Sequence, residues 1–208
     1  MTGFRLPQGG HIDRDRPISF GYDGRCYQGF SGDTLASALI AAGVDQVGRS
    51  VKYHRPRGIF AAGPEEPNAI IQLGSRPDLK ATQVPLVPGL AAHSVNCWPD
   101  ARLDLGAAVG LLRPFLPAGF YYKTFKWPRW SWWEPLIRRA AGLGRVDPAA
   151  VALEGQRRNL HCDVLVVGAG PAGLAAALAA GTDGRRVVLV EQDSHLGGSL
   201  LADPGTID

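Results

Sequence analysis

A strand, glycine loop, helix and second strand follow one another near the end of this sequence, and this order constrains the fold more than any other feature. Four apolar residues, Val164–Val167, lead directly into the sequence GAGPAG at residues 168–173. Residues 174–180 are small and apolar and predict a helix, and Val187–Val190 predict a second strand that ends at Glu191. This arrangement is typical of the βαβ unit that begins a Rossmann-type dinucleotide-binding domain.

Each glycine of this loop has its own physical role. Gly168 permits the tight turn, Gly170 lets backbone N–H groups approach a pyrophosphate, and Gly173 lets the helix lie close to the strand. Pro171 suits the first turn of a helix, where its missing N–H would have had no partner. The phosphates would then meet the positive end of the helix. The cofactor-binding residues that we expect are Gly168, Gly170, Pro171, Ala172, Gly173, Glu191, Gly198 and Ser199.

Glu191 lies 23 residues after Gly168, where a carboxylate can accept hydrogen bonds from the adenosine ribose hydroxyls. An acid at this position favours NAD or FAD over NADP. Because both cofactors carry the same AMP half, these residues alone leave NAD and FAD as alternatives. Gly198 and Ser199 belong to a second glycine-containing segment and are weaker candidates, which would close over the phosphates.

Composition narrows the class of protein. The 208 residues are 45% hydrophobic and 20% charged, which is typical of a globular chain. A net charge of +3 without a basic stripe argues against nucleic-acid binding. Three widely spaced cysteines argue against a disulfide framework, and neither a signal peptide nor a membrane span is recognisable. We therefore expect a cytoplasmic protein without a membrane partner.

The N-terminal third predicts a small mixed sheet packed on one helix. Residues 18–22 and 26–30 flank an Asp23-Gly24-Arg25 turn, which indicates a β-hairpin. Thr34 offers an N-cap for a helix over residues 35–42 that ends at Gly43. Further strands are expected at residues 69–73 and 81–87, which together describe a β-grasp domain.

The sequence resembles a known family along most of its length. The segments GDTLASALIAAGV, VGRSVKYHRPRGIFAAGPEEPNA, FLPAGFYYKTFKWP and CDVLVVGAGPAGLAAALAA resemble the N-terminus of the alpha subunits of heterotetrameric sarcosine oxidases. The resemblance implies a ferredoxin-like first domain that has lost its [2Fe-2S] cluster. A plant-type cluster needs C-x4-C-x2-C and a fourth cysteine, whereas the loop at residues 58–66 contains no cysteine.

The resemblance also implies an activity, cofactors and partners. Such an enzyme oxidises sarcosine, a small amine, to glycine with formation of hydrogen peroxide and transfers the one-carbon unit to tetrahydrofolate. It implies FAD in a beta subunit, FMN between alpha and beta, NAD in alpha, and gamma and delta subunits as further partners. No catalytic residue is expected within these 208 residues, and the chain alone is expected to be inactive.

The predicted architecture is α/β with three parts. Residues 14–98 form the cluster-less β-grasp domain, residues 99–160 an irregular and helical connector, and residues 161–208 a truncated NAD/FAD-binding domain. Since a doubly wound sheet needs more strands than this last part contains, we expect the N-terminal part of a longer polypeptide. A helix is expected at residues 134–143.

Two segments leave alternatives open. The basic loop at residues 47–60 is either an anion clamp for the nucleotide phosphates or a solvated loop whose arginines pair with Glu65, Glu66 or Asp45. The tryptophan-rich segment at residues 120–133 has no regular period. It is interpreted as interdomain packing, as a subunit or cofactor contact, or as an interfacial membrane anchor.

Two other functions remain open for the whole chain. One is a subunit of a related flavin-dependent amine or opine dehydrogenase, many of which keep the cluster cysteines. The other is a non-catalytic adaptor, which would have no need of the glycine motif and its acid.

Overall fold

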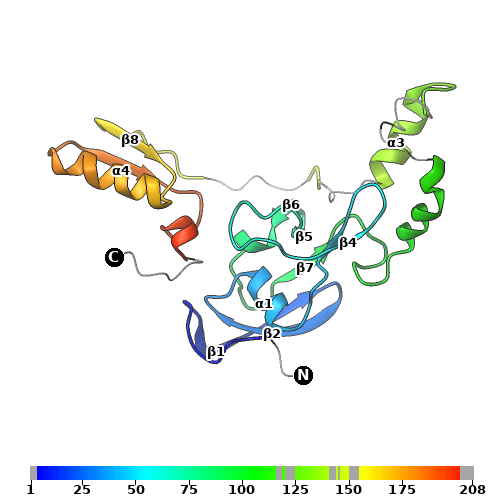
Figure 1. The fold of residues 1–208 in the computed structure, drawn as a ribbon, viewed down its shortest axis with the longest axis horizontal. Coiled ribbons are helices and arrows are strands. Elements are labelled where there is room, and N and C mark those ends of the chain that lie inside the picture. Colours follow the sequence, from blue (N-terminus) through cyan, green and yellow to red (C-terminus); the bar gives the residue numbers. More distant parts are fainter. Residues whose placement is uncertain are drawn as a thin grey trace. The chain divides into compact units, whose positions relative to one another are not determined.

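The computed structural model describes residues 4–115, 119, 125–140, 144, 146–149 and 155–201. The chain divides into two compact units, Met1–Ala150 and Val151–Asp208. Figure 1 labels the elements of both units.

A five-stranded mixed sheet forms the centre of the first unit, with the strand order β2-β1-β7-β5-β6. The strands are β1 (Asp13–Tyr22), β2 (Arg25–Ser31), β5 (Ile70–Leu73), β6 (Arg76–Lys80) and β7 (Ala91–Ser94). Strand β1 runs parallel to β7, and the other pairs are antiparallel. Two short strands, β3 (Gly48–Arg49) and β4 (Pro56–Arg57), make a separate antiparallel ladder.

The expected hairpin between β1 and β2 is present. Asp23 and Gly24 have φ angles of 48° and 73°, as a two-residue type I′ turn requires at both central positions. The Asp23 carboxylate also accepts hydrogen bonds from the backbone N–H and the hydroxyl of Ser94, both at 2.7 Å. The turn therefore fixes the hairpin register and ties it to the end of β7.

Helix α1 (Leu35–Ala41) begins at the N-cap that the sequence predicts. The Thr34 hydroxyl accepts from the N–H of Ser37 at 3.2 Å, and the Ser37 hydroxyl accepts from the N–H of Thr34 at 3.0 Å. This reciprocal pair is a capping box. Gly43, with φ 79°, follows the end of the helix.

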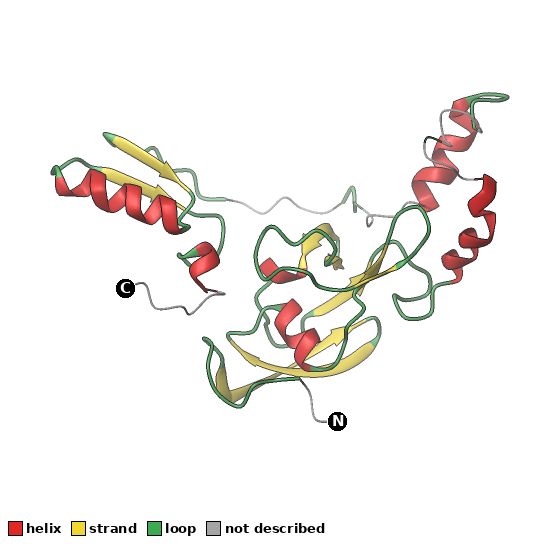
Figure 2. Cartoon of the chain, viewed as in Figure 1, coloured by secondary structure: helices red, strands yellow, loops and turns green. Residues whose placement is uncertain are grey.

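The core lies between α1 and one face of the sheet (Figure 2). Ile18, Phe20 and Tyr22 alternate along β1 and are all buried, as the two-residue period of a strand requires. The buried residues of α1 are Leu35, Ala36, Ala38 and Leu39. The Tyr22 hydroxyl donates to the carbonyl of Val47 at 2.8 Å, and burial raises the pKa of this phenol.

The strand expected at residues 81–87 is wrong. Ala81–Gln83 form a short 3₁₀ turn, η1, and the last strand of the sheet is β7, further along the chain. Pro85 explains the error, because a proline has no N–H to donate to a ladder. It makes a single bridge with Thr34 instead.

Two helical segments follow the sheet: η2 (Leu105–Phe115), a 3₁₀ helix, and α3 (Trp130–Ala140). Helix α3 begins four residues before the expected start at residue 134. Residues 130–133 of the tryptophan-rich segment, for which no regular period is expected, are therefore helical. The Trp127 and Trp132 side chains are exposed. The remainder of these two expectations, at residues 120–124 and 141–143, lies outside the described residues.

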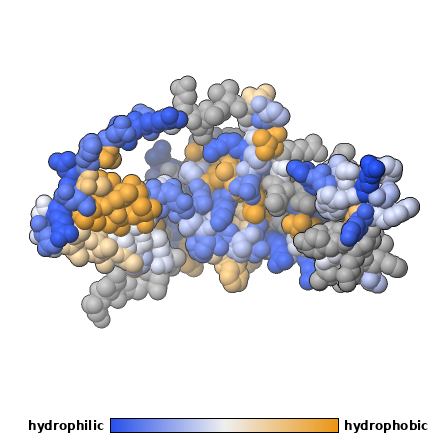
Figure 3. Space-filling view, turned by 90° about the horizontal axis from the view of Figure 1, so that it is seen from above, coloured by the Kyte–Doolittle hydropathy of each residue, from blue (hydrophilic) through white to orange (hydrophobic). Residues whose placement is uncertain are grey.

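The second unit contains β8 (Val164–Val167), α4 (Pro171–Thr182), β9 (Val187–Val190) and a 3₁₀ turn, η3 (Gly198–Leu201). Strands β8 and β9 pair in parallel over all four residues, and α4, the crossover between them, contacts both. Large apolar side chains such as Leu165, Val167 and Leu178 are 58–78% exposed. Apolar surface over this unit is visible in Figure 3.

Candidate functional site

The glycine loop connects β8 to α4, and the fold itself explains two of its glycines. Gly168 has a φ angle of 96°, which favours glycine, and its N–H donates to the carbonyl of Val190 at 2.8 Å. A Cβ at Gly173 would overlap the carbonyl oxygen of Gly168. Both positions therefore need glycine for the turn and for the close approach of helix and loop.

Gly170 is different, because the chain leaves open the direction in which a side chain would extend from its α-carbon. A Cβ built at this position meets no atom within 4 Å, and the φ and ψ angles of −70° and −178° suit any residue. Gly170 is the N-cap of α4, and Pro171 occupies the first turn. Helix N-termini present unpaired N–H groups and a positive partial charge. The open side of Gly170 thus faces a position suited to an anion.

Glu191 lies directly after β9 and next to this loop. Its carboxylate accepts hydrogen bonds from the N–H groups of Ala169 at 2.6 Å, Gln192 at 2.7 Å and Asp193 at 3.1 Å. These bonds, first of all that from Ala169, lower the pKa of Glu191. A carboxylate has about four acceptor positions, so an ionised group with about one free position remains for a ribose hydroxyl.

The second glycine segment also lies against the loop. The N–H of Gly197 donates to the carbonyl of Ala169 at 2.8 Å, and a Cβ at Gly198 would come within 3.0 Å of the Gly170 α-carbon. Ser199 follows in η3. The structure therefore brings the expected site residues to one end of the β8–β9 pair, while their roles toward a ligand stay predictions.

Arg49 of the basic loop forms hydrogen bonds within the first unit. Arg49 donates from Nε to the carbonyl of Ala101 at 2.8 Å, and from its Nη1 and Nη2 atoms to the carbonyls of His54 and Arg102 at 3.0 and 3.1 Å. Arg49 therefore links β3 to the segment that follows β7.

The carboxylate nearest to Arg49 is Asp104, which is not one of the three acidic residues expected to pair with the arginines of this loop. The Nε atom of Arg49 lies 4.0 Å from Asp104, while Glu66 accepts hydrogen bonds from backbone N–H groups. The Arg55 guanidinium lies over the Tyr53 ring, 5.2 Å from its centroid. The anion-clamp hypothesis now depends on residues other than Arg49 and stays a prediction.

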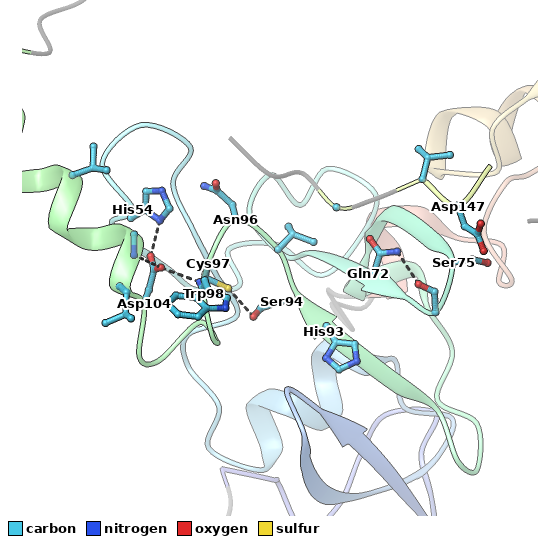
Figure 4. A pocket seen from close by; sticks show the side chains of 17 residues that line it. His54, Gln72, Ser75, His93, Ser94, Asn96, Cys97, Trp98, Asp104 and Asp147 are labelled. Carbon is cyan, nitrogen blue, oxygen red and sulfur yellow. Dashed lines mark hydrogen bonds and ion pairs between the residues drawn. The ribbon is translucent and has the colours of Figure 1, made fainter. Parts of the chain in front are cut away.

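A cavity of about 1060 Å³ lies in the first unit (Figure 4). His54 reaches it from the basic loop, with Nδ1 2.6 Å from a carboxylate oxygen of the buried Asp104. A Cβ at Gly106 would overlap the His54 ring, so the ring fits only above a glycine. His54 and Asp104 are 50 positions apart and belong to no motif, so no sequence pattern indicates the pair.

Several other polar residues line the same cavity, among them Cys97 and Asn96 (Figure 4). The Cys97 thiol lies 2.9 Å from the Ser94 hydroxyl, and burial raises the pKa of this thiol to about 11. The amide oxygen of Asn96 is buried and has no hydrogen-bond partner among the described residues. The cavity therefore combines a thiol, an amide and a His–Asp pair.

Among the described residues no group of three or more His, Cys, Asp or Glu side chains is arranged to hold a metal ion. Within the same residues, no helix has the length and apolar character needed to cross a membrane.

Two family models match parts of the chain. Residues 15–97 match a family described as a 2Fe-2S iron-sulfur cluster binding domain. Residues 163–207 match one described as an FAD dependent oxidoreductase. The two matches follow the division into two units and support a flavoprotein oxidoreductase with a ferredoxin-like first domain.

Two proteins of known name are similar to this chain over nearly its whole length. The sarcosine oxidase subunit alpha of Rhizobium meliloti (strain 1021) is 55% identical over 215 residues, which cover 100% of this chain and 22% of the relative. The subunit of the same name from Corynebacterium sp. (strain P-1) is 35% identical over 210 residues, which cover 96% of this chain and 17% of the relative. A crystal structure of L-proline dehydrogenase from P. horikoshii shares the fold, with a TM-score of 0.50 and 17% identity over 94% of this chain and 27% of that one.

The chain spans about a fifth of the length of the alpha subunits that it matches. With similarity along the whole chain, and with both family models in the same order as the two units, the chain belongs to the sarcosine oxidase alpha-subunit family.

Proposed function

We propose that the second unit is the start of a Rossmann-type domain and binds the AMP half of a dinucleotide between the glycine loop and Glu191. The observation that carries this proposal is the open α-carbon of Gly170 at the N-terminus of α4. The positive φ angle explains the glycine at 168 and packing explains the glycine at 173, whereas at 170 the backbone angles suit any residue and a Cβ would meet no protein atom. A pyrophosphate that approaches the backbone closely accounts for that glycine.

The nucleotide is NAD or FAD. The short distance between the Glu191 carboxylate and the loop supports hydrogen bonding to an adenosine ribose, which both cofactors share. The resemblance favours NAD at this site, and the match to an FAD dependent oxidoreductase favours a flavin. The two are separated by releasing the bound nucleotide with acid from the purified full-length protein and identifying it by chromatography and mass spectrometry.

The whole protein is a subunit of a flavin-dependent sarcosine oxidase. Support comes from relatives of that name at 55% and 35% identity. It converts sarcosine to glycine with hydrogen peroxide as a product, and transfers the one-carbon unit to tetrahydrofolate. A flavin, when bound, supplies the hydride acceptor for the amine and passes the electrons to oxygen. Beta, gamma and delta subunits are its partners, and FMN and FAD are the flavins of the complex.

Within this assembly the present residues bind and orient a nucleotide. The catalytic residues lie outside these 208 residues, so the chain alone is inactive. We place the protein in the cytoplasm. Oxygen consumption by the purified complex with sarcosine tests the activity. L-proline is the comparison amine, because the structurally similar protein is an L-proline dehydrogenase. A complex that oxidises proline and leaves sarcosine untouched would contradict the assignment.

Gly170→Ala tests the nucleotide site directly. The new methyl group meets no protein atom, so the fold is retained, but it occupies the space expected for the phosphates. We expect the bound nucleotide to fall well below one per chain. Gly181→Ala is the matched control, because this glycine of α4 is equally uncrowded and lies far along the helix from its N-terminus. Full nucleotide content in Gly170→Ala would rule out the site.

A further inference from the structure

A single buried carboxylate organises the loop between β4 and β5. Glu66 is 0% exposed. Its Oε2 atom accepts hydrogen bonds from the N–H groups of Phe60 at 2.6 Å and Ala61 at 2.5 Å. Its Oε1 atom accepts from those of Asn68 at 2.7 Å and Ala69 at 3.1 Å. Two N–H groups on each side of Glu66 in the sequence therefore converge on one anion.

The spacing of these residues is that of an iron-sulfur loop. Ala61, Glu66 and Ala69 stand at the intervals of the first three cysteines in C-x4-C-x2-C. They lie in the part of the chain that matches the 2Fe-2S cluster binding domain. Iron-sulfur clusters are held by cysteine thiolates, with histidine as the replacement in some centres. Two alanines and a carboxylate do not fit that group.

Converging backbone N–H groups form anion-binding concavities, and many phosphate and iron-sulfur sites are built in this way. In this loop the donors that would face such a group are already bonded to Glu66. We propose that the Glu66 carboxylate is the resident anion of this loop and takes the place of a cluster. The first unit then has the fold of an iron-sulfur domain, with the loop stabilised by the Glu66 carboxylate, and it transfers no electrons.

The electrostatics of the loop agree with this assignment. Burial raises the pKa of Glu66, but the four backbone N–H donors together outweigh it, and the pKa is lowered. The neighbouring charged side chains, Glu65 and Lys80, bond to backbone groups and not to Glu66. Glu65 accepts from the N–H of Gly63 at 3.2 Å, and the Lys80 ammonium donates to the carbonyl of Pro64. Glu66 is therefore the charged group that the loop encloses.

Glu66→Gln tests the role of the charge, because its amide group would direct N–H donors at two N–H donors of the loop. In the full polypeptide, with any subunits that copurify, we expect the amides of residues 60, 61, 68 and 69 to exchange hydrogen roughly tenfold faster or more. Glu65→Gln, which changes an exposed neighbour, is the matched control. Equal protection of these amides in both variants would overturn the proposal.

Two measurements on the unchanged protein apply even where Glu66→Gln does not fold. Protection of the four amides should decrease as the pH falls below about 4.3, the unperturbed pKa of Glu, because a lowered folded-state pKa gives stability that protonation removes. Protection that is constant down to pH 3 would contradict the proposal. Iron and acid-labile sulfide should be far below one cluster per chain, and a stoichiometric cluster would overturn it. Neither result depends on nucleotide binding by the second unit.

Discussion

Buried carboxylates in the first unit accept hydrogen bonds from backbone N–H groups as well as from cationic or hydroxyl side chains. Asp104 accepts from the backbone N–H groups of Trp98 and Gly106 at 3.0 and 2.9 Å as well as from His54. Asp33 accepts from the N–H of Phe30, from Ser37 and from the Arg5 guanidinium. Such groups tolerate burial because several hydrogen-bond donors contact each carboxylate. Loop shape in this unit is therefore set by single acidic residues.

Cysteine reactivity is a prediction at the same scale. Burial, with a smaller contribution from Asp23, Asp104 and Asp100, raises the pKa of Cys97 to about 11, although its bond with Ser94 acts in the opposite direction. Roughly a thousandth of this thiol is ionised at pH 8, and the thiolate is the nucleophile. We expect iodoacetamide to modify the exposed Cys26 much faster than Cys97 in the folded protein. Mass spectrometry of peptides during the reaction measures both rates, and equal rates would contradict the prediction.

At the scale of elements, success and failure of the sequence predictions have separate causes. The β1–β2 hairpin and α1 were predictable because Asp23-Gly24 and Thr34 act through local backbone geometry. The glycine loop was predictable for the same reason. The His54–Asp104 pair was not, since only the folded sheet brings the two residues together. The strand expected at residues 81–87 is not formed, because Pro85 lies within this segment and has no N–H to donate to a ladder.

The cap of α1 allows a quantitative test. Thr34→Ala removes the side-chain oxygen that accepts from Ser37, and we expect it to lower the free energy of unfolding by about 1 kcal/mol. Thr34→Ser keeps the hydroxyl and should stay within about 0.5 kcal/mol of the unchanged protein. Urea denaturation followed by circular dichroism compares the two. Identical losses in both variants would show that the cap contributes little.

At the scale of the whole molecule, the two units differ in how much they bury. The first has a continuous core between α1 and the sheet. In the second, Ala169 is the one described residue that is both apolar and buried, and α4 buries none of its side chains. A helix that is apolar on all sides normally lies inside a larger domain. The second unit therefore buries what part of a larger domain would bury, and the chain spans about a fifth of the length of its relatives.

This difference predicts how separate pieces behave. Residues 4–115, expressed alone, should show cooperative urea unfolding, because their core is complete. Residues 155–201 should show none and should aggregate, since two strands and one helix bury too little apolar area. Circular dichroism and light scattering measure both. A cooperative transition in the shorter piece would show that the second unit is stable by itself.

The parallel pairing of β1 with β7 has a consequence for synthesis of the protein. These strands are neighbours in the sheet, yet about 70 residues separate Gly21 and Tyr22 from their partners Ala91 and Ala92. A nascent chain therefore leaves the ribosome with this edge of β1 unpaired until β7 has also emerged. The hairpin can form early, but the sheet closes in one late step. During that interval the growing polypeptide presents an apolar strand edge, the state in which a chaperone would bind it.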